Sequence, residues 1–311
     1  METPIKAAYV FPGQGSQFVG MGRDLYENYK SARAIFDLAD RVLGTSLSKT
    51  CFEGPEETLR DTINAQPALV VSSLATLAAI REQYDGKGIP QASYVAGHSL
   101  GEYTALAVSG VFDFSTAVFL ARERGRLMHE ATKVRPGTMA AVIGMDEAEV
   151  DKICADAGVC IGNVNCPGQL VISGDKDKVA KAVAVVQSGG KGKAIPLSVS
   201  AAFHSPLMEP AVEGMLKALS NVNFVEPLIP VVANTTGVAM TTVAEIKTEL
   251  LGQLTHCVKW QQSVEFMLSK GVNAFYELGA GKVLTGLIRR IDKNVKTFTI
   301  GDVNGIKSLA S

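Results

Sequence analysis

The residues best suited to chemistry lie in the segment 97–101, Gly-His-Ser-Leu-Gly, which follows an apolar run and precedes a helix-forming one. The pattern Gly-x-Ser-x-Gly between a strand and a helix is typical of a nucleophile elbow, whose sharp turn exposes a serine hydroxyl. Glycines at both ends leave room where strand and helix approach each other. We therefore expect Ser99 to be a nucleophile and the Leu100 N–H, at the positive end of the helix, to hold an oxyanion. The alternative is a tight strand–helix connection with a capping serine.

A serine nucleophile needs a general base, and the chain has four histidines, at positions 98, 129, 204 and 256. His204 lies in a loop beside Ser205 and Pro206, before a helix predicted over 207–219, and catalytic groups often lie in such loops. His98 adjoins Ser99, but the turn points adjacent side chains apart, so we expect it to pack or hydrogen-bond beside the turn. The histidines lack the spacing of metal ligands, and we predict no metal site.

Three arginines, at positions 122, 124 and 126, interrupt an otherwise amphipathic helix predicted over 116–130, with Ser115 as its N-cap. At about 100° per residue, Arg124 falls near the apolar face of the helix, whereas Arg122 and Arg126 share another face. Arg124 is therefore expected to point inward. A partly buried arginine paired with a structural carboxylate is the alternative to a functional role.

A glycine-rich turn, Pro-Gly-Gln-Gly-Ser-Gln at 12–17, follows the first predicted strand. It does not fit a dinucleotide fingerprint, because Phe18 stands where a third glycine is needed, and it lacks the Lys-Ser/Thr of a P-loop. These glycines are better explained as letting the backbone approach a ligand closely, as a second oxyanion donor requires.

Composition limits the class of protein. The 311 residues are 47% hydrophobic with a net charge of −1, which favours neither nucleic acid nor an anionic membrane as partner. Five cysteines without a Cys-x-x-Cys pair indicate a reducing compartment. Residues 1–10 show no signal peptide, and no apolar run approaches the roughly 20 residues that span a bilayer. We expect a cytoplasmic protein, or a plastid or mitochondrial one if a transit peptide was removed. It is expected to be a monomer, because no heptads occur.

The predicted elements define an α/β fold with two domains. Strands alternate with helices over most of the chain, which predicts a mostly parallel sheet covered on both faces. Residues 132–198 have the order βαββαβ, which is the ferredoxin-like unit. We predict a large catalytic domain over 1–131 and 199–311, with 132–198 inserted in it as a small domain.

Four segments together carry a resemblance to a known family: residues 12–17, Gly97 to Glu102, Arg124-Gly125, and Phe203-His204. In this order and at these separations they are similar to those of malonyl-CoA:acyl carrier protein transacylases, acyltransferases of fatty acid and polyketide synthesis. The resemblance runs from about Tyr9 to Ile288. It implies an α/β-hydrolase-like large domain with an inserted ferredoxin-like domain. It also implies malonyl-CoA and a phosphopantetheine-bearing acyl carrier protein as partners, and no cofactor.

The resemblance assigns roles to individual residues. It implies Ser99 as nucleophile, His204 as base, the backbone amides of Gln14 and Leu100 as oxyanion hole, and Arg124 as the arginine that binds the malonyl carboxylate. The family uses a Ser–His dyad in which a backbone carbonyl orients the histidine.

The resemblance puts that carbonyl at Gln253 and a bulky side chain that excludes an α-methyl group at Phe203. Met128 either lines the same pocket or packs in the core. Asn163 and Asn165 are expected to border the site from the small domain.

The implied reaction is a ping-pong transfer of malonyl to the carrier protein thiol, which supplies extender units for fatty acid synthesis. A serine hydrolase, either a thioesterase or an esterase, is the main competing hypothesis. It would usually carry an acid between nucleophile and histidine, where Asp151, Asp156 and Asp175 are available without a motif. We also consider a non-catalytic subunit, and the same transfer in a polyketide or malonate pathway.

Overall fold

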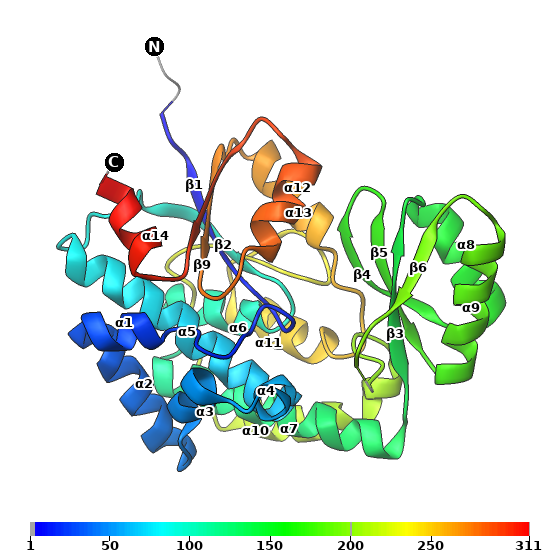
Figure 1. The fold of residues 1–311 in the computed structure, drawn as a ribbon, viewed down its shortest axis with the longest axis horizontal. Helices are drawn as coiled ribbons and strands as arrows, with labels where there is room; N and C mark the ends of the chain where they lie inside the picture. The colour runs from blue at the N-terminus through cyan, green and yellow to red at the C-terminus, as the bar shows by residue number, and fades with distance from the viewer. Residues whose placement is uncertain (1–3, 200, 311) are drawn as a thin grey trace.

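The larger part of the protein is built on a six-stranded sheet (Figure 1). The computed structural model describes residues 4–199 and 201–310, so the predicted domain limits at residues 1 and 311 lie outside it. The first five strands of the sheet are parallel and β8 is antiparallel to β7. The strand order is β10 (Lys296–Ile300), β9 (Ala274–Leu278), β1 (Ala7–Phe11), β2 (Ala92–Gly97), β7 (Val231–Val232) and β8 (Ala239–Met240).

Both faces of this sheet are buried, as the apolar sequence of its strands predicts. Ala7, Tyr9 and Phe11 of β1 enter one apolar cluster, and the alternating Ala8 and Val10 enter another. The second cluster is covered by α12 (Trp260–Ser269) and α13 (Val283–Ile291). The first is covered by α1 (Arg23–Asn28), α2 (Lys30–Leu43), α3 (Leu47–Glu53), α4 (Glu56–Arg60), α5 (Thr62–Gln83), α6 (Gly101–Val108), α7 (Phe114–Val134), α10 (Val212–Ser220), α11 (Val243–Gly252), α14 (Val303–Lys307) and the 3-10 turn η2 (Ser308–Ala310).

Helix α5 runs through the centre of the first cluster. By length and composition it is the one helix in the described part of the chain that could cross a membrane. The sequence did not predict this helix as a candidate span, because no apolar run in it approaches the roughly 20 residues that span a bilayer. However, 78% of its most apolar window is buried inside the protein. An apolar helix enclosed in this way is expected of a core element, because its surface already packs against protein.

A second, four-stranded antiparallel sheet lies beside the first (Figure 1). It follows the predicted order βαββαβ, and α8 and α9 enclose an apolar cluster separate from the other two. The elements are β3 (Thr138–Ile143), α8 (Glu147–Ala157), β4 (Cys160–Cys166), β5 (Gln169–Gly174), α9 (Lys176–Ser188) and β6 (Lys193–Pro196). The sheet order β4-β5-β3-β6 is that of the ferredoxin-like fold, so the predicted fold class is confirmed.

The two sheets are joined by the chain and by backbone hydrogen bonds. The N–H of Val164 on β4 donates to the Val258 carbonyl at 2.9 Å, and the Val258 N–H donates to Gly162 at 2.9 Å. This two-sided bridge joins the small sheet to the loop before α12.

Two helix predictions were wrong at their ends. Helix α7 begins at Phe114 because the Asp113 side chain, rather than that of Ser115, caps it by accepting the Thr116 N–H at 2.8 Å. It also runs on to Val134, past the predicted domain limit at 131/132. The helix predicted over 207–219 is divided into a 3-10 helix η1 (Pro206–Ala211) and α10, because Pro210 lacks an N–H for a continuous helix.

Candidate active site

Ser99 lies at a sharp turn between β2 and α6, as the glycine pattern predicts. Its φ is 51°, in the left-handed region that non-glycine residues rarely adopt. A Cβ at Gly97 would lie 1.9 Å from the carbonyl carbon of Gly101, and a Cβ at Gly101 would lie 2.1 Å from the Phe11 oxygen. The turn therefore closes only with glycine at both positions, and it holds Ser99 half-buried at the head of α6.

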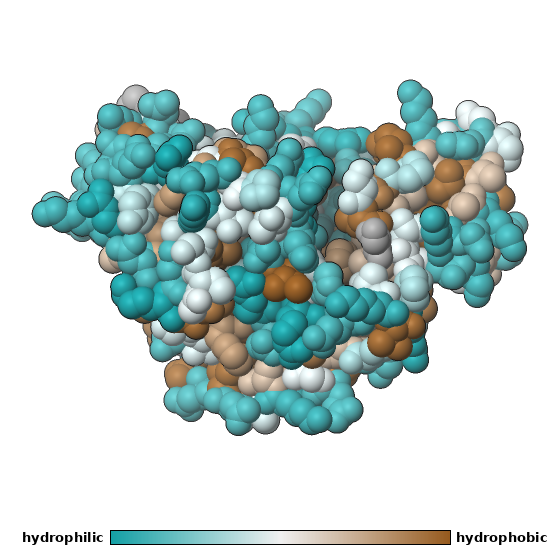
Figure 2. All heavy atoms as spheres, turned by 60° about the horizontal axis from the view of Figure 1, so that its bottom comes forward, coloured by the Kyte–Doolittle hydropathy of each residue, from teal (hydrophilic) through white to brown (hydrophobic). Residues whose placement is uncertain are grey.

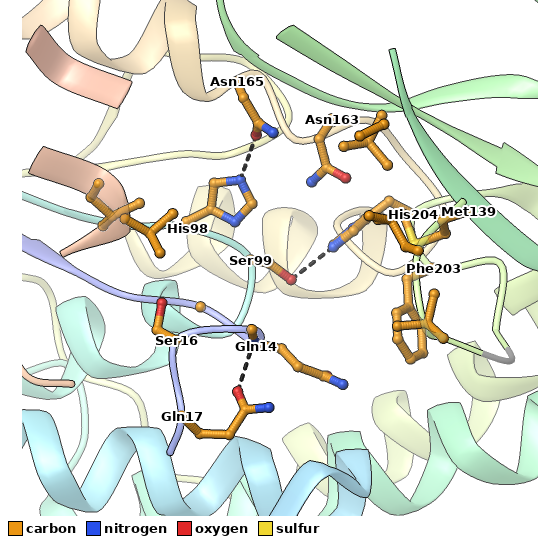
Figure 3. Close-up of a pocket in the computed structure, with 18 of the residues that line it drawn as sticks. Gln14, Ser16, Gln17, His98, Ser99, Met139, Asn163, Asn165, Phe203 and His204 are labelled. Atoms are coloured by element: carbon orange, nitrogen blue, oxygen red, sulfur yellow. Dashed lines mark hydrogen bonds between the residues drawn. The ribbon is translucent and has the colours of Figure 1, made fainter. Parts of the chain in front are cut away.

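Two short contacts connect Ser99 to a backbone carbonyl through His204, and Figure 3 shows the first of them, between Ser99 and His204. The Ser99 Oγ lies 2.7 Å from His204 Nε2, and His204 Nδ1 lies 2.8 Å from the Gln253 carbonyl oxygen. A carbonyl oxygen can only accept, so Nδ1 carries the ring proton and Nε2 presents a lone pair to the serine hydroxyl. The arrangement is that of a nucleophile and an oriented base.

The His204 ring is kept neutral by its surroundings. Burial lowers its pKa to about 3, and the nearby Arg124 charge acts in the same direction. The side chain is only 4% exposed, so an imidazolium would lose most of its hydration. At neutral pH His204 is therefore in the form that can accept the Ser99 proton.

Arg124 points into the site, which confirms the prediction from helix periodicity; it is 1% exposed. Its Nη1 donates to Gln66 Oε1 at 2.8 Å, and its Nη2 donates to Gln253 Oε1 at 2.7 Å and to Ser99 Oγ at 3.2 Å. Among residues 4–199 and 201–310, no carboxylate forms an ion pair with it, and its Nε has no partner. The alternative of a structural ion pair is thus not found, and the guanidinium is a buried, unpaired cation beside the nucleophile.

A cavity of about 510 Å³ opens in front of Ser99. It lies between the two sheets, and Figure 2 shows the surface hollowed where these two parts of the molecule meet. Figure 3 shows side chains from both parts turned toward it. The predicted site residues that line it are Gln14, Ser99, Arg124, Met128, Asn163, Asn165, Phe203 and His204.

Two backbone amides are available beside the nucleophile. Within the described ranges of the chain, neither the Leu100 N–H nor the Gln14 N–H has a hydrogen-bond acceptor. The loop of Gln14 is pressed onto the turn, since a Cβ at Gly13 would lie 2.3 Å from the His98 carbonyl oxygen. The Gln14 side chain is held away from the turn by Thr62, whose Oγ1 donates to Gln14 Oε1 at 2.9 Å.

The remaining predicted residues form the walls of the cavity. The carbonyl of Phe203 accepts the Ser173 hydroxyl at 2.6 Å, so β5 holds the loop that carries His204. Met128 is 1% exposed and lines the cavity, which combines the two roles left open for it. His98 Nε2 lies 2.9 Å from Asn165 Oδ1, which confirms its expected hydrogen-bonding role (Figure 3).

Sequence reasoning missed four polar side chains that form hydrogen bonds behind Ser99 and Arg124: Gln66, Glu102, Asn234 and the Gln253 side chain. The Asn234 Oδ1 accepts the Ser99 N–H at 2.6 Å, and Glu102 accepts the Asn234 N–H at 2.8 Å. Glu102 had a visible signal, because it is the single charge in the apolar segment 101–108. Asn234 also had one, because it follows β7 at the carboxyl edge of the sheet, where sites gather.

The three aspartates considered as a triad acid lie elsewhere. Asp151, Asp156 and Asp175 are all exposed on the small-sheet part and do not line the cavity. The contact of His204 Nδ1 with the Gln253 carbonyl takes the place that an acid would occupy. The fold and site thus have the geometry of an α/β enzyme of the acyl-transfer class, in which a serine hydroxyl is hydrogen-bonded to a neutral, oriented histidine.

Comparison with known proteins identifies the family. The model of the acyl transferase domain matches residues 8–302. A malonyl CoA-acyl carrier protein transacylase of Bacillus subtilis is 42% identical over 307 residues, which cover 97% of this chain and 95% of the relative. The chain belongs to the acyl transferase domain family and is an acyltransferase.

Solved structures agree with this assignment. An acyl-carrier-protein S-malonyltransferase from Bartonella henselae superimposes with a TM-score of 0.94 at 41% identity, covering 99% of this chain and 100% of that one. A malonyl-transacylase in complex with a type II PKS acyl-carrier protein gives a TM-score of 0.93 at 37% identity, covering 98% of both chains.

Proposed function

We propose that this protein transfers a malonyl group from malonyl-CoA to the phosphopantetheine thiol of an acyl carrier protein, by a ping-pong mechanism on Ser99. The observation that carries the proposal is the unpaired Arg124 guanidinium, 3.2 Å from the hydroxyl of a serine that is hydrogen-bonded to a neutral histidine. Relatives that carry this activity in their names match nearly the whole chain.

The first half-reaction loads the enzyme. His204 Nε2 accepts the Ser99 proton as Oγ attacks the thioester carbonyl carbon, and the carbonyl oxygen becomes an oxyanion. The free N–H groups of Leu100 and Gln14 donate to that oxyanion, an effect typically worth about 3–4 kcal/mol for one donor. The intermediate collapses by breaking the carbon–sulfur bond, and His204 returns the proton to the coenzyme A sulfur.

The second half-reaction runs in reverse with a new thiol. The pantetheine thiol of the carrier protein gives its proton to His204 and attacks the malonyl ester. The tetrahedral intermediate then breaks its bond to Ser99 Oγ, which regains a proton from His204. The same cavity of about 510 Å³ serves both thiols in turn, because coenzyme A and the carrier arm both end in pantetheine.

Selectivity follows from burial of the cation. A malonyl carboxylate gives Arg124 the anionic partner that it lacks, through two charge-assisted hydrogen bonds. An acetyl group would leave the guanidinium desolvated and unpaired, which is costly. Phe203 lines the same cavity and fills the space that an α-methyl group would need.

The Gln253 carbonyl that orients His204 supports a transferase over a serine hydrolase. Hydrolases of related fold usually place a carboxylate there. We further propose a role in fatty acid synthesis, with polyketide synthesis as the second candidate because of the relative solved with a type II PKS carrier protein. The proposal includes a monomer that acts in the cytoplasm without nucleic acid or membrane partners. It also includes the division into 132–198, with its own core, and the remaining chain.

Mass spectrometry of the intact protein after brief mixing with malonyl-CoA tests the proposal, with Ser99→Ala alongside. We expect a malonyl adduct on the wild type alone, discharged faster by holo-carrier protein than by water. Equal discharge by water would identify a hydrolase. An adduct on Ser99→Ala would refute the assigned nucleophile, and no adduct on the wild type would refute malonyl-CoA as donor.

A further inference from the structure

A buried run of polar contacts leads from Glu102 to Arg124 behind the nucleophile. Glu102 on α6 is fully buried, and its Oε1 accepts the backbone N–H of Asn234 at 2.8 Å and the Asn234 Nδ2 at 3.0 Å. Its Oε2 accepts from the Nε2 of Gln253. The Oε1 of Gln253 then accepts from Arg124 Nη2 at 2.7 Å. The side chain of Gln253 thus lies between the two buried charges.

The amide of Gln253 has one orientation that satisfies all its neighbours. Its Nε2 donates to the Ser99 carbonyl oxygen at 2.9 Å and to Glu102, and both of these atoms can only accept. Its Oε1 faces the Arg124 guanidinium, which can only donate. Turning the amide over would bring two donors together at Arg124 and two acceptors together at Ser99.

The position of Glu102 demands acceptors at both ends of the side chain. One oxygen meets the backbone N–H of Asn234, which is a fixed donor, and the other meets the Gln253 N–H. A carboxylate accepts at both ends, whereas a carboxamide must present N–H groups at one of them. Burial and the nearby Glu249 carboxylate raise the pKa of Glu102 well above its ordinary value, whereas its N–H donors and the Arg124 charge act in the opposite direction.

We propose that Glu102 is a positioning residue that fixes the orientation of the Gln253 amide, and through it the Arg124 guanidinium, so that Glu102 sets selectivity for acyl groups with a free carboxylate. In the described part of the chain, the Glu102 side chain forms no hydrogen bond with Ser99, His204 or Arg124; only its backbone N–H donates to the Ser99 carbonyl, at 3.2 Å. The inference rests on the proposed function, because it assigns a further residue to the same malonyl selectivity.

The substitution Glu102→Gln tests this directly, because it keeps the shape and removes the second acceptor. Its oxygen still accepts from Asn234, so the Asn234 contact with the Ser99 N–H is kept. Its N–H groups then oppose the Gln253 Nε2, which must release either the Ser99 carbonyl or Arg124. We expect the malonyl-CoA to acetyl-CoA ratio of kcat/KM to fall about tenfold or more, with the acetyl-CoA value within about threefold of wild type.

Three further variants separate positioning from a general structural role. Glu102→Asp keeps two acceptor oxygens, so its malonyl-CoA to acetyl-CoA ratio of kcat/KM should fall less than that of Glu102→Gln. Glu277→Gln is the matched control, since Glu277 is another buried glutamate but its side chain accepts from the Leu284 and Thr285 N–H groups, and its ratio should equal that of wild type. Gln253→Met keeps the backbone carbonyl that holds His204 and removes the side-chain amide. Its malonyl-CoA to acetyl-CoA ratio of kcat/KM should therefore fall as it does in Glu102→Gln.

The double variant Glu102→Gln/Gln253→Met completes the test. Because Glu102 acts through the Gln253 amide, we expect no further loss of the ratio beyond that of Gln253→Met alone. A Glu102→Gln enzyme with the wild-type ratio, or losses that simply add in the double variant, would overturn the inference. If thermal melting shows that Glu102→Gln is unfolded, the test passes to Gln253→Met: a malonyl-CoA to acetyl-CoA ratio equal to that of the wild type in this variant would overturn the inference. A wild type that takes no malonyl from malonyl-CoA refutes the proposed function itself.

Discussion

Replacing Arg124 by alanine gives the sharpest test of the site. The guanidinium is 1% exposed, and its Nη2 lies 3.2 Å from the Ser99 hydroxyl. Its partners Gln66 and Gln253 are both neutral amides, so they orient the group without cancelling its charge. Arg124→Ala therefore removes the charge that distinguishes malonyl from acetyl in the proposed function, while Ser99 and His204 keep their mutual contact.

The size of the effect follows from the hydrogen bonds lost. A carboxylate bound to a guanidinium through two charge-assisted hydrogen bonds gains about 1.5–3 kcal/mol from each. The sum of about 3–6 kcal/mol corresponds to a loss of roughly a hundredfold to ten-thousandfold in kcat/KM for malonyl-CoA, at about 1.4 kcal/mol per factor of ten. Acetyl-CoA gains nothing from the guanidinium, so its kcat/KM should be unchanged or higher.

The assay compares kcat/KM for malonyl-CoA and acetyl-CoA, with holo-carrier protein as acceptor. It is run near pH 8, because loss of the Arg124 charge raises the pKa of His204, which must stay neutral in both enzymes. Arg122→Ala is the matched control, since Arg122 lies on the same helix but contacts Asn64 and does not line the cavity. A malonyl to acetyl ratio unchanged in Arg124→Ala, or lost equally in Arg122→Ala, would refute the reasoning.

Three further outcomes follow from the same contacts. Gly101→Ala should lower the free energy of unfolding in urea by more than about 2 kcal/mol, because its Cβ would lie 2.1 Å from the Phe11 oxygen. Gly286→Ala is the control: its Cβ would meet no atom within 4 Å, so the free energy of unfolding should not fall. His204, with its pKa lowered to about 3, should make the protein lose stability as pH falls below 6.5, by up to about 1.4 kcal/mol per unit; an unchanged pH profile in His204→Gln would contradict this. Phe203→Ser should raise kcat/KM for methylmalonyl-CoA relative to malonyl-CoA about tenfold, and an unchanged ratio would assign Phe203 to packing alone.

Local patterns in the sequence predicted the parts of the site whose geometry is local. The turn at Ser99 is specified by two glycines within five residues, and the inward direction of Arg124 follows from 3.6 residues per turn on one helix. The contacts of Gln253 are not local, because 154 positions separate it from Ser99 and 151 from Glu102. An amide side chain has no periodicity that reveals its partner, so these contacts appear only once β2, α6 and the end of α11 are assembled.

The Gln253 residue also explains why a neutral carbonyl, and not a carboxylate, holds His204. A carboxylate at that position would add a second anion within reach of Arg124, and it would raise the pKa of His204 by stabilising the imidazolium. It would also compete with the substrate carboxylate for the guanidinium. The Gln253 backbone carbonyl orients the ring at 2.8 Å without a net charge, and its side-chain oxygen holds Arg124 at 2.7 Å in the same neutral way. Gln253 thus orients His204 and Arg124 without adding a negative charge. Burial keeps the base neutral, and in the proposed function Arg124 binds the carboxylate that malonyl brings.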